Sequence, residues 1–92
     1  MKSKIKTAKQ LERHLKGVAN HRRIEILNVV AKEEGISLED IAERLQTNIK
    51  TISEHTRRLA QAGLVDKKYR GRNVGHTLSP YGKIFHKFLT TF

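Results

Sequence analysis

Apolar residues recur with the helical period along most of the chain, so the sequence predicts a mainly helical domain. Each expected helix begins after a Thr, Asn or Ser, whose side-chain oxygen can accept hydrogen bonds from the free amides of the first turn. The second of these helices is the most apolar and is expected to form the core. The expected spans before the first strand are Thr7 to about Ala19, His21 to about Glu34, Leu38–Leu45, and Asn48 to about Gly63.

The stretch from Asn48 to Val65 has two different faces. The apolar face, which should pack on the core, holds Ile52, Thr56, Leu59 and Ala60. The opposite face holds Lys50, Ser53, Glu54 and Arg57, with Ile49 and Thr51 at its leading end. A capped helix with short polar groups and cations on its exposed face suits the DNA major groove, although a solvated surface helix has the same pattern.

A short polar connector, Gln46-Thr47-Asn48, joins this helix to Leu38–Leu45. Ser37 caps the earlier helix, and Asp40 is placed to complete a capping box. Two short helices joined in this way, the second capped and basic, form a helix-turn-helix arrangement.

Residues 64–78 read as a β-hairpin, because two flanks with Val, Tyr, Thr and Leu surround an expected Gly71-Arg72-Asn73 turn. A hairpin with so many cations is suited to contacting phosphates. The cations of the hairpin are Lys67, Lys68, Arg70 and Arg72. Together with the preceding helices, the hairpin predicts a winged helix-turn-helix fold, mainly α with a small β-hairpin.

The two terminal helices carry more apolar surface than one small domain needs. The first helix has a narrow stripe of Leu11, Leu15 and Val18, which is either a lid on the core or half of a dimer seam. The last helix starts at Ser79-Pro80. Its apolar face holds Tyr81, Ile84, Phe85, Phe88 and Leu89, with Phe92 beyond it. So many aromatic groups favour a subunit interface over packing on the same domain.

The length of 92 residues predicts a single domain over residues 1–92, in which the basic residues 1–7 are expected to be flexible. The formal net charge is +10 and is unevenly distributed. Residues 1–23 hold eight Lys or Arg and one acidic residue. Residues 24–48 hold two Lys or Arg and six acidic residues, and residues 49–92 hold nine Lys or Arg and two acidic residues. This pattern favours a polyanionic partner, with simple solubilising charge as the alternative.

Several classes of function are not expected from this sequence. The chain has no Cys, which excludes disulfides and thiolate chemistry. It shows no apolar run of membrane length and no signal peptide at its start, so we expect a cytoplasmic protein without a membrane partner. The absence of a Gly-rich phosphate loop and of a Ser-His-Asp context argues against an enzyme, and no cofactor is expected. The five His residues lack ligand spacing and are expected to be exposed or internally hydrogen-bonded, so no metal site is expected.

Three segments resemble the ArsR-type bacterial and archaeal repressors, one of them Ser37 to Leu45, which is similar to the helix before the turn in that family. Residues 15–27, LKGVANHRRIEIL, are similar to the opening of that family. Residues 48–65 are similar to its recognition-helix stretch, with matches at Thr51, Ser53, His55, Leu59, Ala62, Gly63, Leu64 and Val65. The resemblance covers roughly residues 11–79, and the ending of residues 78–82, LSPYG, is also similar to MarR-like and PadR-like regulators.

This resemblance implies a homodimeric repressor that binds palindromic double-stranded DNA through its recognition helix and wing, with the first and last helices forming the dimer. The expected DNA-binding residues are Asn48, Ile49, Lys50, Thr51, Ser53, Glu54, His55, Arg57, Lys67, Lys68, Arg70 and Arg72. The resemblance identifies no small-molecule effector. A winged helix that binds protein or RNA remains the alternative.

The sequence also departs from the family at named positions. Ser37 and Glu39 replace the Cys-x-Cys of its metalloid sensors, and the last helix has His86 but no acid, so neither metal site of the family is expected. Glu54 stands where the family often has Arg, which removes a phosphate contact or adds an acceptor for cytosine N4. Thr56 and Arg58 replace apolar residues, which predicts looser packing of the recognition helix.

Overall fold

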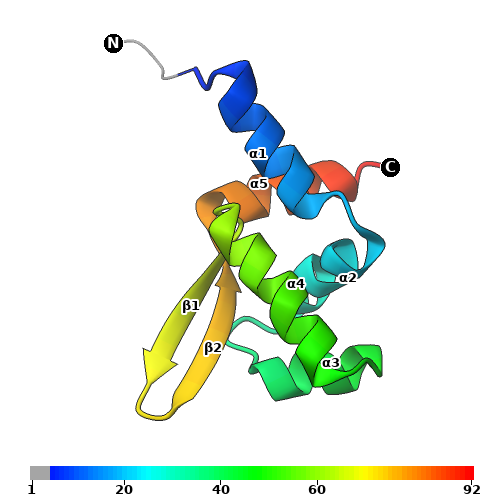
Figure 1. Ribbon diagram of the computed structural model, residues 1–92, viewed down its shortest axis with the longest axis vertical. Coiled ribbons are helices and arrows are strands. Elements are labelled where there is room, and N and C mark those ends of the chain that lie inside the picture. Colours follow the sequence, from blue (N-terminus) through cyan, green and yellow to red (C-terminus); the bar gives the residue numbers. More distant parts are fainter. Residues whose placement is uncertain (1–4) are drawn as a thin grey trace.

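Five helices and one antiparallel hairpin follow one another in the order that the apolar pattern predicts, in a computed structural model that describes residues 5–92 (Figure 1). The expectation of a flexible start falls largely on residues 1–4, which lie outside the described part. None of the described helices is long and apolar enough to cross a bilayer. The elements are α1 (Ala8–Val18), α2 (His21–Lys32), α3 (Leu38–Leu45), α4 (Ile49–Gln61), β1 (Val65–Arg70), β2 (Asn73–Leu78) and α5 (Pro80–Leu89).

The helix starts follow the predicted caps. Thr7 and Gln10 form a reciprocal capping box on α1, and the Asn20 side chain accepts from the amides of Arg22 and Arg23. Ser79 caps α5, with Pro80 at the first helical position. The helix α2 ends at Lys32, earlier than the predicted Glu34. Glu33 already leaves the helical region, with φ −127° and ψ 77°.

The core forms around α2, as predicted from its apolar content. Ile26, Leu27 and Val30 of this helix are completely buried. The inner faces of α3 and α4 close over them with Ile41, Ala42, Ile52, Thr56 and Leu59. Ala60, which was predicted inside, is only partly buried.

The turn between α3 and α4 is tight. Gln46 adopts a left-handed conformation with φ 49°, and the amide of Thr47 donates to the carbonyl of Ala42. At the far end of α4, Gly63 has φ 79° and the amide of Leu64 donates to the carbonyl of Leu59, so the helix ends close to the predicted Gly63.

The hairpin is tighter than predicted. Arg70 pairs with Asn73, so only Gly71 and Arg72 form the turn, and Asn73 is the first residue of β2. Gly71 has φ 60°, which suits the first central position of a type II′ turn, the kind that matches strand twist. The base of the hairpin is fixed to the loop before α3 by a bridge between Ile36 and His76.

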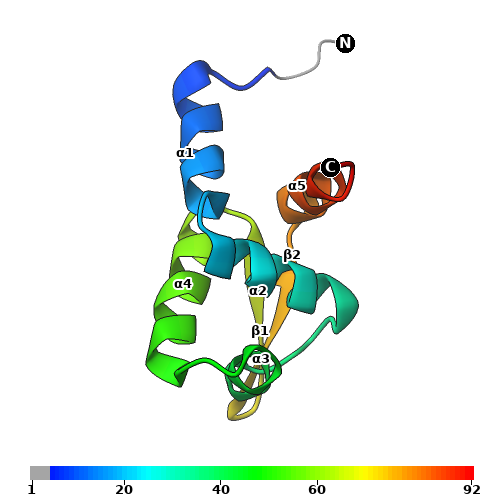
Figure 2. The ribbon, with the colours of Figure 1, turned by 90° about the vertical axis from the view of Figure 1, so that its right-hand side faces the viewer.

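The terminal helices and the hairpin tip lie at opposite ends of the domain. In Figures 1 and 2, α1 and α5 occupy one end of the long axis, whereas α3 and the hairpin tip occupy the other. The helix α4 runs between these ends, and its C-terminus packs closely on α1. A β-carbon at Gly17 would collide with the side chain of Ala62, so the two helices touch backbone to side chain.

Candidate nucleic-acid interface

The exposed face of α4 carries the residues that the sequence predicted. Lys50, Thr51, Ser53, Glu54 and Arg57 are all exposed. Ile49, at the leading end, is 41% exposed. The helical period puts these groups opposite the buried Ile52, Thr56 and Leu59, so the core fixes the direction in which they project.

The start of α4 is exposed to solvent and is capped by Asn48. The Asn48 side-chain oxygen accepts from the amide of Lys50 at 2.7 Å. The other amides of the first turn have no intrahelical acceptor, as at any helix start, and can bind a phosphate.

One carboxylate organises the charges on this face. Nη2 of Arg57 donates to both oxygens of Glu54 at 2.7 Å, and Nε of Arg58 donates to Glu54 Oε2 at 3.0 Å. The bonds from Arg57, and then from Arg58, lower the pKa of Glu54 to about 2. No prediction from the sequence included this cluster, although the i,i+3 and i,i+4 spacing could have revealed it.

His55 is hydrogen-bonded to α2 rather than free on the exposed face of α4. Its Nδ1 accepts from Nε of Arg23 at 3.2 Å, and Nη1 of Arg23 also bonds the carbonyls of Lys16 and Gly17 at 3.3 Å. Burial, and then the charge of Arg23, lower the pKa of His55. Arg23 therefore joins the end of α1 to the middle of α4, a contact between residues far apart in sequence that no local pattern signals.

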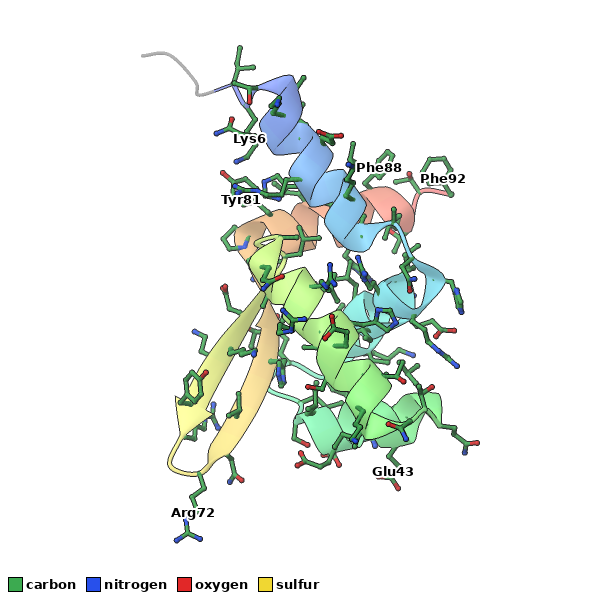
Figure 3. The ribbon with its side chains drawn as sticks, in the orientation of Figure 1. Lys6, Glu43, Arg72, Tyr81, Phe88 and Phe92 are labelled. Atoms are coloured by element: carbon green, nitrogen blue, oxygen red, sulfur yellow. The ribbon has the colours of Figure 1, made fainter. Side chains whose placement is uncertain are left out.

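The four cations of the hairpin divide between its two faces, as strand alternation requires. Lys67 and Arg72 line a groove of about 270 Å³ that Ser53 and Thr56 of α4 and Leu38 and Glu39 of α3 also line. Lys68 and Arg70 line a separate hollow on the other face, beside Gly35. Arg72 projects outward from the tip (Figure 3). The hairpin, which is the wing of this fold, therefore carries positive charge on the face beside α4, at its tip and on its opposite face.

The predicted dimer residues fall into two groups. Leu11, Leu15, Tyr81, Ile84 and Phe88 are exposed on α1 and α5, Ile84 to 63% and Phe88 to 52%. Phe85 and Leu89 are partly buried against the domain's own core.

The placement of Val18 on the dimer surface was wrong. Val18 is only 6% exposed, because the end of α1 packs on α4 at Gly17 and turns Val18 into the core.

Aromatic side chains at the α1–α5 end contact one another and α1. The ring centroids of Tyr81 and His14 are 5.1 Å apart, and Nζ of Lys6 lies over the Tyr81 ring, 4.2 Å from its centroid. The rings of Phe88 and Phe92 meet edge to face at 5.1 Å. Figure 3 shows Tyr81 beside Lys6, with Phe88 and Phe92 toward the C-terminal end of α5.

Two histidines are structural. His14 Nδ1 bonds the carbonyl of Ala62 at 2.7 Å, and His76 Nδ1 bonds the carbonyl of Ile36 at 2.9 Å; both rings are buried. Within residues 5–92, no three His, Asp or Glu side chains are grouped so that they could hold a metal ion.

Residues 18–86 match the family HVO_A0114, and no curated protein matches the chain in sequence. Solved structures share its fold. Mb0332 from Mycobacterium bovis, described as a homodimeric winged helix-turn-helix DNA-binding domain and possible ArsR-family regulator, aligns with TM-score 0.80 and 26% identity over 90% of this chain and 78% of that one. HlyU from Vibrio cholerae aligns with TM-score 0.81 and 28% identity over 94% of both chains.

The transcriptional repressor PagR of Bacillus anthracis has the same fold, with TM-score 0.80 and 20% identity over 88% of this chain and 93% of that one. The predicted winged helix-turn-helix fold and the resemblance to ArsR-type regulators are therefore confirmed.

Proposed function

The chain belongs to the HVO_A0114 family, and from its winged helix-turn-helix fold we propose that it is a transcriptional regulator that binds double-stranded DNA as a homodimer. In this proposal α4 enters the major groove, and the hairpin contacts the flanking backbone or minor groove. The function is binding rather than catalysis.

One observation carries the proposal: one residue of the polar face of α4 and two of the four hairpin cations line a common groove, at the end of the domain away from α1 and α5. Ser53 of α4 and Lys67 and Arg72 of the hairpin line this groove together. A recognition helix and a cationic wing that project from one rigid core form a surface that can read base edges and bind phosphates at the same time.

The exposed apolar surface of α1 and α5 supports a homodimer. Leu11, Leu15, Ile84 and Phe88 are all close to half exposed or more, and they come from the two helices at the same end of the domain. A two-fold axis through this end would present two recognition helices to one side of the duplex. The operator would then be palindromic, with half-site centres one helical turn, ~34 Å, apart.

Repression is the proposed outcome, because a dimer that covers two adjacent half-sites excludes other proteins from that stretch of a promoter. PagR, which shares the fold, is described as a transcriptional repressor. The His, Asp and Glu residues of the described chain offer no grouped metal ligands, so the proposal includes no metal-dependent step.

The test is a selection of binding sites from random DNA, followed by fluorescence anisotropy at several salt concentrations. Three to five phosphates neutralised per subunit give a slope of log affinity against log salt of roughly −5 to −9 for the dimer. Enrichment of no duplex sequence, with no salt-dependent duplex binding, would overturn the proposal and leave a protein- or RNA-binding winged helix in its place.

A further inference from the structure

The face of α4 that we propose to bind DNA carries an acidic residue, although the DNA backbone is itself negatively charged. Glu54 stands between Ser53 and His55 on the exposed side of the helix and is itself about half exposed, with 47% of its side chain accessible. The phosphates of a duplex would repel it, so its presence needs an explanation other than affinity.

The explanation lies in the two arginines that it holds. Both oxygens of Glu54 accept from Arg57 at 2.7 Å, and Oε2 also accepts from Arg58 at 3.0 Å. Both guanidinium groups are therefore held against the helix surface by the same carboxylate. In this arrangement the Glu54, Arg57 and Arg58 cluster has one positive charge rather than two.

The cluster contributes little to the fold. All three side chains are about half exposed, and exposed ion pairs at helical spacing stabilise a protein only slightly. Its effect therefore falls on whatever binds the exposed side of α4.

We propose that Glu54 is a specificity-determining residue of the DNA interface: it withholds Arg57 and Arg58 from the phosphates of arbitrary DNA and releases them where base pairs supply donors for its own oxygens. This inference rests on the proposed function. Phosphate contacts carry no sequence information, so restraining two arginines lowers the affinity for every sequence alike. A carboxylate only accepts hydrogen bonds, and in the major groove it is satisfied by the N4 amino group of cytosine or the N6 amino group of adenine.

The experiment compares Glu54→Gln and Glu54→Ala with the wild type on two duplexes, a random sequence and the sequence enriched by selection. Glutamine keeps the shape and removes the charge, whereas alanine removes the acceptor and favours the helix. The control is Glu12→Gln, which makes the same charge change in the same i,i+4 arrangement, with Lys16 at 3.2 Å, on α1.

If one further phosphate is neutralised per subunit, the salt slope of the variant dimer on random DNA becomes steeper by about two, and its affinity near 0.1 M salt rises roughly tenfold or more. The ratio of selected to random affinity should fall at least as much, while Glu12→Gln leaves that ratio unchanged. Adding Arg57→Ala to Glu54→Gln should remove part of the gain, because one of the released cations is then missing.

The results separate the two proposals. Wild-type protein that binds its selected duplex with the expected slope, while both Glu54 variants keep the wild-type affinity and slope on random DNA, would overturn the role of Glu54 and leave the proposed function standing. Wild-type protein without salt-dependent duplex binding would overturn both. Circular dichroism of each variant should show the helix content of the wild type, which checks that the substitution leaves the domain folded.

Discussion

Nε of Arg23, in the first turn of α2, donates a hydrogen bond of 3.2 Å to Nδ1 of His55, in the middle of α4. The same guanidinium binds the last carbonyls of α1 through Nη1. One side chain therefore joins the helix of the proposed dimer surface to the helix of the proposed DNA surface. Because His55 is the acceptor, the contact requires an unprotonated Nδ1.

The first prediction concerns pH. Burial, and then Arg23, lower the pKa of His55 in the folded state, so the folded protein resists its protonation. The contribution of this group to stability is complete above the unfolded pKa of about 6.5 and is lost as the pH falls below it toward the lower folded value. Urea unfolding midpoints should thus decrease from pH 7.5 to pH 5. In His55→Gln, whose oxygen accepts from Arg23 without titrating, the decrease should be smaller; an equal decrease would contradict this role of His55.

The second prediction concerns Thr56, which is 1% exposed and whose hydroxyl oxygen has no hydrogen-bond partner among the described residues. A buried, unsatisfied polar group costs about 1–3 kcal/mol. Thr56→Val keeps the branched shape and removes the hydroxyl, so we expect it to raise the free energy of unfolding by about 1 kcal/mol. Thr51→Val, on the exposed face of the same helix, is the control and should change little. Destabilisation by Thr56→Val would mean that the hydroxyl is satisfied in solution.

The third prediction concerns the dimer. Phe88 is 52% exposed on α5, so Phe88→Asp should leave the domain folded while placing a charge in the proposed apolar interface. Sedimentation at micromolar concentration should show about twice 10.6 kDa for the wild type and a monomer for the variant. Tyr69→Asp makes a similar change on the hairpin, where Tyr69 is 73% exposed, and should remain dimeric. A monomeric wild type would remove the basis for a palindromic site.

The fourth prediction concerns the wing. Arg72→Ala should weaken binding to all duplexes alike, because Arg72 projects outward from the hairpin tip, where we expect it to contact a phosphate rather than a base. The salt slope should become shallower by about one for each phosphate that the arginine no longer neutralises. Lys32→Ala removes the same charge at the end of α2 and should leave the slope unchanged. The wing would be excluded from the interface if Arg72→Ala and Lys32→Ala gave the same slope as the wild type.

The sequence predicted what depends on neighbouring residues. Local hydrogen bonding and the helical period predict the two faces of α4 and the caps at Thr7, Asn20, Ser37 and Asn48. The structure has these caps and both faces, although Ala60 of the apolar face is only partly buried. It did not predict the contact of Arg23 with His55, which depends on how α2 crosses α4. The burial of Val18 likewise depends on the close approach at Gly17, which a helical pattern within α1 cannot reveal. Dimer formation and DNA binding by the named residues stay predictions.

The close contact of Gly17 with Ala62 limits the half-site spacing that the proposed dimer can bind. Together with the bond from His14 to the carbonyl of Ala62, it fixes the tilt of α4 to the helix through which two copies would join. In a dimer built this way, the two copies of α4 would keep a fixed distance from each other and a fixed rotation about the DNA axis. Inserting about five base pairs between half-sites would turn one of them to the opposite side of the duplex, out of reach. Inserting a full helical turn of base pairs would bring both half-sites back to the same side of the duplex, but would place them farther apart than the two copies of α4.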